Sequence, residues 1–152
     1  MALIVKKFGG SSVGNIDKIK AVAKRILDEK QPDDKIVVVV SAMGDTTDDL
    51  IQLAKGITKD PYQYTREMDM LLTTGEQVSI SLLTMAFKAL GQKAISLTGA
   101  LAGVKTNSVH TKGKIKDIQP KRIFEELDKG NIVIVVVVCI GEIVLILHST
   151  LN

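Results

Sequence analysis

The sequence contains no tryptophan, a single cysteine and few aromatic residues of any kind. One cysteine, Cys139, cannot form an internal disulfide, so we expect a reducing compartment and a cytoplasmic location. Aromatic residues make up 3% of the 152 residues, whereas hydrophobic residues make up 45%. A chain of this length has the size of one ordinary domain, and its core is predicted to be large and aliphatic.

Basic clusters and unbroken hydrophobic runs of membrane-spanning length are also missing. The net charge of +3 is spread along the chain, with acidic and basic residues interleaved, so we expect no nucleic-acid partner. Charged residues interrupt "ALIVKKFGG" at once, which is not typical of a signal peptide. Gly141 and Glu142 divide the apolar stretch "IVIVVVVCIGEIVLIL", which favours two buried strands around a turn at "CIGE" over a membrane helix.

Strands and helices are predicted to alternate along the chain. Continuous apolar strands without a polar face are typical of a mainly parallel sheet covered by helices on both sides. The predicted strands are 2–7, 35–43, 93–99 and one that starts at Ile132, with a small hairpin at 109–118 turning at Gly113. The predicted helices are 15–28, one from about Thr47 with Leu50, Leu53, Ala54 and Ile57 on one side, 61–72, 75–90 and 120–130.

Small polar residues and glycines follow three of the predicted strands, in "KFGGSSVG", "SAMGDTTDD" and "SLTGALAG". In sheets of this kind, ligands bind beyond the carboxyl ends of the strands. Three similar loops at three strand ends therefore predict a shared site.

The loop "KFGGSSVG" fits an anion. Gly9 and Gly10 let backbone N–H groups come close to a phosphate, the next helix offers the positive end of its dipole, and Lys7 adds a full charge. The spacing matches neither the P-loop nor the dinucleotide motif. A tight turn with a solvated lysine explains the same eight residues equally well.

Two further stretches have a structural and a functional interpretation each. Thr46 or Thr47 can cap the second helix, and either hydroxyl can also bind a polar substrate group. Glu76 follows Gly75 at the start of a predicted helix, where the dipole stabilises a carboxylate, and it can also hold a substrate ammonium group. His110 and His148 have no partners at metal-ligand spacing, so no metal site is predicted.

Five stretches occur in the order seen in aspartate kinases, and the chain resembles that family from about Ala2 to Val135. The stretches are "KFGGSSVG", "VVVVSAMGDTTDDL", "LLTTGEQVSI", "KAISLTGALAG" and "SVHTKGKI". The resemblance implies the amino-acid kinase fold, a three-layer α/β/α sandwich. It also implies transfer of the γ-phosphoryl group of ATP, with Mg²⁺, to the β-carboxylate of L-aspartate, and a homo-oligomer. That reaction opens the route to lysine, threonine and methionine.

The resemblance also implies roles for seven residues. Lys7 is similar to the catalytic lysine that stabilises the transferring phosphoryl group. The nucleotide phosphates are expected beside Lys7, Phe8, Gly9, Gly10 and Ser41. Thr47 and Glu76 match positions that hold the amino-acid substrate.

Other parts depart from the family pattern. Leu101 stands where the family usually has glutamine, and residues 136–152 do not resemble it. The glycine-rich "GRGGSD" segment and the regulatory ACT domains do not occur, so residues 1–152 are expected to be one partial kinase domain with little or no activity of its own. The alternatives are another amino-acid kinase, such as an acetylglutamate or uridylate kinase, or a non-catalytic fragment that binds phosphate or associates with other chains.

Overall fold

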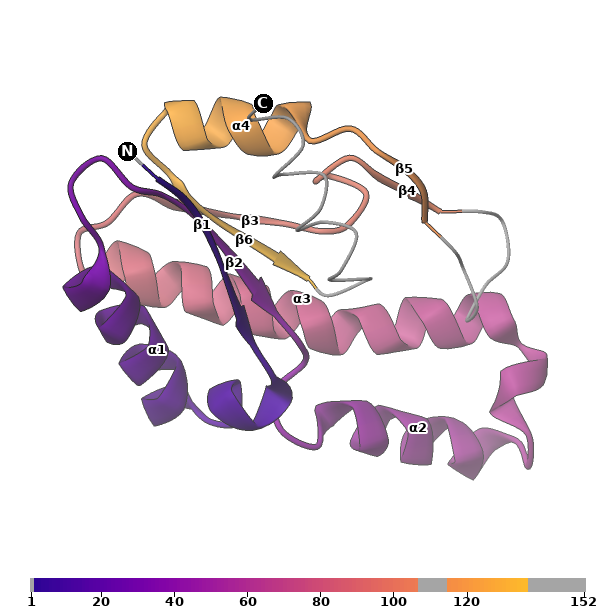
Figure 1. Cartoon of the computed structure of the whole chain (residues 1–152). Coiled ribbons are helices and arrows are strands. Elements are labelled where there is room, and N and C mark those ends of the chain that lie inside the picture. The colour runs from indigo at the N-terminus through magenta and orange to yellow at the C-terminus, as the bar shows by residue number, and fades with distance from the viewer. Residues whose placement is uncertain (1, 107–114, 137–152) are drawn as a thin grey trace.

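A computed structural model describes residues 2–106 and 115–136 (Figure 1). The strands are β1 (Leu3–Phe8), β2 (Lys35–Val40), β3 (Ala94–Leu97), β4 (Val104–Thr106), β5 (Ile115–Ile118) and β6 (Ile132–Val136). The α-helices are α1 (Ile16–Glu29), α2 (Thr46–Ile57), α3 (Thr65–Ala89) and α4 (Lys121–Asp128), and two short 3-10 helices are η1 (Gly10–Val13) and η2 (Pro61–Gln63). The predicted strands after Val136 lie outside the described residues.

Four strands form a parallel sheet in the order β1-β2-β6-β3. The last described strand, β6, therefore lies between β2 and β3, and both of its neighbours come much earlier in the sequence. All five residues of β6 and five of the six in β2 are buried, as expected for strands covered on both faces. Because the strands are parallel, their carboxyl ends meet at one edge of the sheet.

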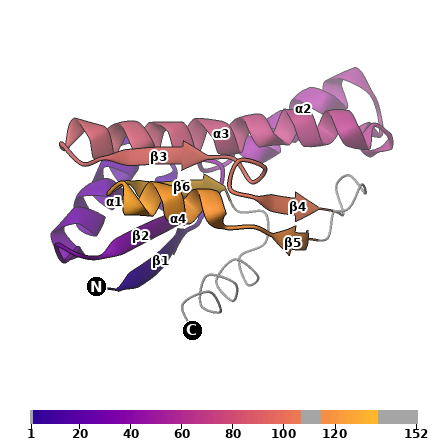
Figure 2. The same cartoon turned by 90° about the horizontal axis from the view of Figure 1, so that it is seen from above.

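Helices cover both faces of this sheet, which confirms the predicted three-layer α/β/α arrangement (Figures 1 and 2). On one face, Ile36, Val38 and Val40 of β2 pack in a core cluster with residues of α1 and α3. On the other face, Val37 and Val39 share a second cluster with residues of α4. Alternating residues of one strand thus enter two separate aliphatic cores.

Helix α1 follows its prediction closely. The side chain of Asn15 accepts a hydrogen bond from the backbone N–H of Lys18, so the predicted cap is confirmed. Ile19, Val22 and Ile26 are buried on its inner face. The helix starts at Ile16, two residues beyond Gly14, and it follows η1, which begins at Gly10.

The capping prediction for the second helix is wrong. Thr46 and Thr47 lie inside α2, whose N-cap position is Asp45, and no side-chain cap bond forms there. Residues of α2 are not buried, and Leu53 and Ile57 of the predicted apolar side are exposed. In Figure 1, α2 and the first turns of α3 extend past the ends of the described strands of the parallel sheet, so these strands do not cover them.

The predicted break between helices 61–72 and 75–90 does not exist either. Residues 61–63 form η2, and α3 then runs unbroken from Thr65 to Ala89. Gly75 is buried inside this helix, where a Cβ would lie 3.0 Å from Cγ2 of Thr46. A glycine normally weakens a helix by about 1 kcal/mol, and here close packing against the first turns of α2 accounts for it.

The predicted hairpin is confirmed as an antiparallel pair but starts earlier. Its first strand is β4, pairing Val104 with Ile118 of β5, and the turn around Gly113 lies outside the described residues. Helix α4 begins directly after Pro120, and Gly130 follows its end with a φ of +81°, as predicted. Within the described residues, no helix is both long enough and apolar enough to cross a bilayer.

Candidate functional site

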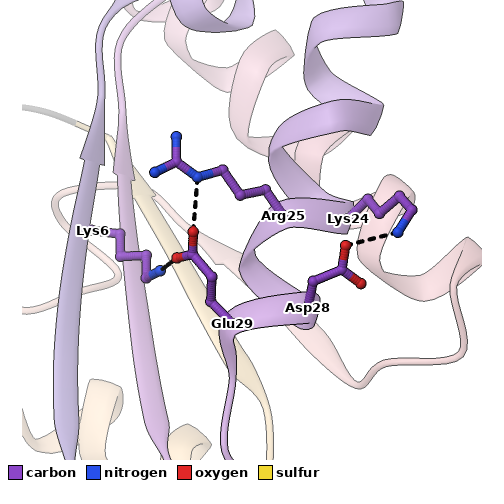
Figure 3. Close-up of polar contacts among 5 residues, drawn as sticks. All are labelled: Lys6, Lys24, Arg25, Asp28 and Glu29. Atoms are coloured by element: carbon purple, nitrogen blue, oxygen red, sulfur yellow. Dashed lines mark hydrogen bonds and ion pairs between the residues drawn. The ribbon is translucent and has the colours of Figure 1, made fainter.

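Two neighbouring lysines of β1 lie in different surroundings. Lys6 faces α1, where its ammonium group pairs with the carboxylate of Glu29, and Arg25 Nε donates to the other oxygen of that carboxylate at 2.9 Å (Figure 3). The hydrogen bond from Lys6, followed by that from Arg25, lowers the pKa of Glu29 to about 2. A second pair on the same helix, Lys24 with Asp28, is an exposed contact of 2.7 Å.

Lys7 lies on the opposite face of β1, because successive side chains of a strand point to opposite sides. It is exposed and has no ion pair or hydrogen bond with the described part of the chain. Two residues further on, Gly9 has no atom within 4 Å of the position a Cβ would occupy. A free cation next to an open glycine backbone fits the phosphate-binding interpretation of this loop.

The loops after β1 and β2 are joined through their backbones. The N–H of Gly44 donates to the carbonyl of Gly10 at 2.9 Å, and a Cβ on Gly10 would lie 2.7 Å from the carbonyl oxygen of Ala42. Only glycine allows this approach at position 10. Gly44 itself has a φ of +45°, which also favours glycine. Two of the three predicted loops thus form one structural unit at the carboxyl edge of the sheet.

Ser41 and Phe8 meet within this unit. The N–H of Ser41 donates to the carbonyl of Phe8 at 3.4 Å, which extends the pairing of β1 and β2 by one residue. The Phe8 side chain packs against the core on the α1 side and lines a hollow with Ser11, Ser12 and Lys18. Phe8 therefore faces away from Lys7, and only its backbone takes part in the joined loops.

Thr47 and Glu76 are carried by two elements that are in contact. Thr46 and Gly75, which directly precede them, pack against each other, so α3 lies against the first turn of α2 at this point. Thr47 is exposed in that turn, which also contains Asp48 and Asp49.

The environment of Glu76 differs from the prediction. It lies in the middle of α3 rather than at a helix start, so no N-terminal dipole stabilises its carboxylate. The side chain is half-buried and has no polar partner within the described residues. Burial raises the pKa of Glu76, since desolvation disfavours the charged form. A cationic ligand group at this position would offset that cost.

The third loop stays apart from the other two, because β6 separates its strand, β3, from β2. Its chain turns at Thr98, whose carbonyl accepts from the N–H of Ala102 at 2.8 Å. Gly103 then approaches Gln119 so closely that a Cβ would lie 2.1 Å from its carbonyl oxygen. Leu101, at the position where glutamine was expected, is 61% exposed. Ala102 of this loop is buried in the second core cluster, with residues of β2, β6 and α4.

One residue at the joined loops was not predicted from the sequence. Ser79, on α3, is buried, and its hydroxyl donates to the carbonyl of Ser41 at 2.6 Å. The only sequence indication is that Gly75 and Ser79, both small, stand four residues apart, which places them on one face of a helix. Within the described residues, no three His, Cys, Asp or Glu side chains are grouped so that they could hold a metal ion.

Comparison with known proteins agrees with this arrangement. The sequence profile of the amino acid kinase family matches residues 2–142, and the chain belongs to that family. Within it, the chain is 53% identical over 135 residues to aspartokinase 2 of Bacillus subtilis and 54% identical over 135 residues to the aspartokinase of Geobacillus stearothermophilus. Each match covers 89% of this chain and 33% of the relative, so the chain spans about a third of the length of these relatives.

Solved structures support the same fold. Aspartate kinase from Synechocystis superposes with a TM-score of 0.74 at 48% identity, covering 88% of this chain and 21% of the other. An isopentenyl phosphate kinase superposes with a TM-score of 0.68 at 16% identity, covering 90% and 56%. At that identity the second likeness concerns the fold alone.

Proposed function

We propose that this chain supplies the phosphate-contacting and amino-acid-contacting elements of an aspartate kinase, which transfers the γ-phosphoryl group of ATP to the β-carboxylate of L-aspartate. Residues 1–152 would then be part of one kinase domain. The observation that carries the proposal is the joining of the two glycine loops beside Lys7, a cation without a partner in the described structure. The similarity to aspartokinases supports the choice of acceptor.

Each residue has a role that follows from its surroundings. Lys7 would place positive charge beside the phosphoryl group as its bonds loosen, where compensation contributes most to the rate. Gly9 and Gly10 would let backbone N–H groups approach the phosphates, with Ser41 at the neighbouring strand end. Mg²⁺ would enter with ATP and neutralise charge on the phosphates, since phosphates commonly supply much of its coordination.

Aspartate would be held between α2 and α3. The Glu76 carboxylate suits the ammonium group, and binding of this group would favour the charged form that burial disfavours. The Thr47 hydroxyl is exposed in the first turn of α2 and can bind a carboxylate oxygen. An aspartokinase III from Escherichia coli, whose structure contains aspartate and ADP, shares this fold with a TM-score of 0.70.

The test has a binding part and a turnover part. Titration calorimetry on the chain should detect binding of ATP with Mg²⁺ and of L-aspartate, with glutamate and N-acetylglutamate as competing acceptors. ADP release should be measured with the full product of the gene that encodes this sequence, with and without aspartate. Binding of aspartate in preference to N-acetylglutamate, and aspartate-dependent ADP release, are the expected results. Release that depends on another acceptor would refute the assignment.

We also propose that the protein is a cytoplasmic homo-oligomer acting in lysine, threonine and methionine synthesis. The exposed apolar residues of α2, with Ile57 at 89% exposure, support self-association because water contacts there are unfavourable. Light scattering coupled to a sizing column should give a mass above that of one chain. A monodisperse monomer at all concentrations would refute the oligomer.

A further inference from the structure

The hydroxyl of Ser79 links two segments that are 38 residues apart in the sequence. Its oxygen lies 2.6 Å from the carbonyl oxygen of Ser41 and 3.1 Å from that of Glu76. A serine has one hydroxyl hydrogen, so the shorter contact to Ser41 is the stronger bond. Ser79 is 1% exposed, and water therefore does not compete for this bond.

Ser41 is held from both sides as a result. Its N–H donates to Phe8 of β1, and its carbonyl accepts from Ser79 of α3. The end of β2 is thereby fixed between the strand that carries Lys7 and the helix that carries Glu76. Removal of the Ser79 hydroxyl would leave the Ser41 carbonyl without this bond and free the loop on the α3 side.

Gly75 extends the same contact by one helical turn. A Cβ at Gly75 would lie 3.0 Å from Cγ2 of Thr46 and 3.3 Å from the Cβ of Ala42. Gly75 and Ser79 thus form a seam on one face of α3 that lies against residues 41–46. Glu76 sits between them in sequence, so the seam sets where its carboxylate stands relative to the joined loops.

We propose that Ser79 is a positioning residue that fixes the distance between the amino-acid side and the phosphate side of the site. The proposal rests on the proposed function. Each ligand alone depends mainly on one side, so binary affinities should change little when the link is lost. Transfer depends on both sides together, because a misplacement of about 1 Å can cost about 100-fold in rate.

The test compares Ser79→Ala with Thr84→Ala. Thr84 is a buried residue of the same helix, and its hydroxyl also donates to a backbone carbonyl, that of Ile80 at 2.7 Å. That bond stays within α3, so its loss should weaken the helix without moving the loops. If Ser79→Ala does not fold, Ser79→Cys takes its place, since a thiol keeps the side-chain shape and donates only weakly.

The first readout is amide hydrogen exchange on the chain without ligands. In Ser79→Ala, the N–H groups of Gly44 and Thr46, which are bonded to Gly10 and Met43, should exchange about tenfold faster or more. In Thr84→Ala they should exchange as in the wild type. Unchanged exchange in Ser79→Ala would overturn the anchoring of the loop, whether or not the protein is a kinase.

The second readout is kinetic. In the full gene product, Ser79→Ala should lower kcat about 100-fold while KM for aspartate and for ATP stays within about threefold. Thr84→Ala should leave kcat and both KM values unchanged. Faster exchange together with a normal kcat would overturn the positioning role. A wild-type protein that binds neither ligand and releases no ADP would instead refute the proposed function, and with it the catalytic part of this proposal.

Discussion

The charges on the flank of α1 and the charges at the strand ends differ in whether they have partners. Lys6, Arg25 and Glu29 satisfy one another on the flank (Figure 3). Lys7, adjacent to Lys6, has no partner in the described structure, and the half-buried Glu76 has none either. The pKa of Glu29 is lowered by its partners, whereas the pKa of Glu76 is raised by burial.

This difference is consistent with the proposed site at the strand ends. Exposed ion pairs contribute little to stability, and the flank network needs no further explanation than local electrostatics. An ionisable group that is desolvated without a partner costs stability, and such groups collect at sites where a ligand completes the pairing. Glu76 is such a group and would be complemented by a cation from outside the chain, whereas Lys7, exposed and without a partner among the described residues, would be complemented by an anion.

Replacement of Lys7 should have the largest effect. Lys7→Met should lower kcat about 100- to 1000-fold in the full gene product, because the lost charge is needed most in the transition state. Aspartate affinity should stay nearly the same. Lys6→Met is the matched control on the adjacent residue and should change kcat less than about threefold. Equal losses in the two variants would remove the distinction between the two lysines.

Replacement of Glu76 or Thr47 should have the second-largest effect, a loss of substrate affinity. Glu76→Ala should weaken aspartate binding about 10- to 100-fold and Thr47→Val about 2- to 10-fold, as expected for charged and neutral hydrogen bonds. Calorimetry should show ATP affinity unchanged in both. Thr46→Val, which keeps the methyl group that contacts Gly75, serves as the control and should bind aspartate normally. Normal aspartate affinity in both site variants would refute their role.

Replacement of Glu76 should raise the stability of the folded chain, although it should weaken aspartate binding. Since the pKa of Glu76 in the folded chain is raised above its ordinary value of 4.5, the unfolded chain loses the proton first as pH rises. The free energy of unfolding should therefore fall above that value, and Glu76→Gln should be more stable than the wild type at pH 7. Urea unfolding of both proteins, measured from below pH 4.5 up to pH 7, tests this expectation. Glu125→Gln, an exposed change on α4, should show no such gain.

The smallest effect is expected from replacement of Glu29 on the flank of α1, and it should appear in the pH dependence of stability. The pKa of Glu29 in the folded chain, about 2, lies below its ordinary value of 4.5, so its contribution to stability is present above pH 4.5 and lost as pH falls toward 2. Glu29→Gln should flatten the acid side of the stability profile and leave ligand binding unchanged. An unchanged profile would show that the network contributes nothing measurable.

Much of the fold follows from local patterns in the sequence. The valine-rich strand β2 and the apolar stripe of α1 are strong periodic features, and Asn15 marks a helix start by its own chemistry. Patterns failed where a distant segment decided the outcome. Gly75 reads as a helix breaker until the packing of Thr46 against it is known. Leu53, on the apolar side predicted for the second helix, is exposed because α2 extends past the described strands of the parallel sheet.

In the candidate site too, local sequence patterns indicate some residues, whereas others depend on contacts with distant segments. Lys7, Gly9 and Gly10 could be assigned to a phosphate loop because glycine and charge act locally. The bond between Ser79 and Ser41 joins residues 38 apart, and no spacing rule connects them. The environment of Glu76 was also mispredicted, because its effect on the carboxylate depended on a helix boundary that does not exist.

The place of β6 between β2 and β3 has a consequence for synthesis of the chain. β2 ends at Val40 and its neighbour β6 ends at Val136, so 136 − 40 = 96 residues must be added before the pairing is complete. At typical rates of 5–20 residues per second, this takes roughly 5 to 20 s. During that time a strand of consecutive valines has one edge open to other chains. Pulse-labelled nascent chains should become protease-resistant only after Val136 has left the ribosome.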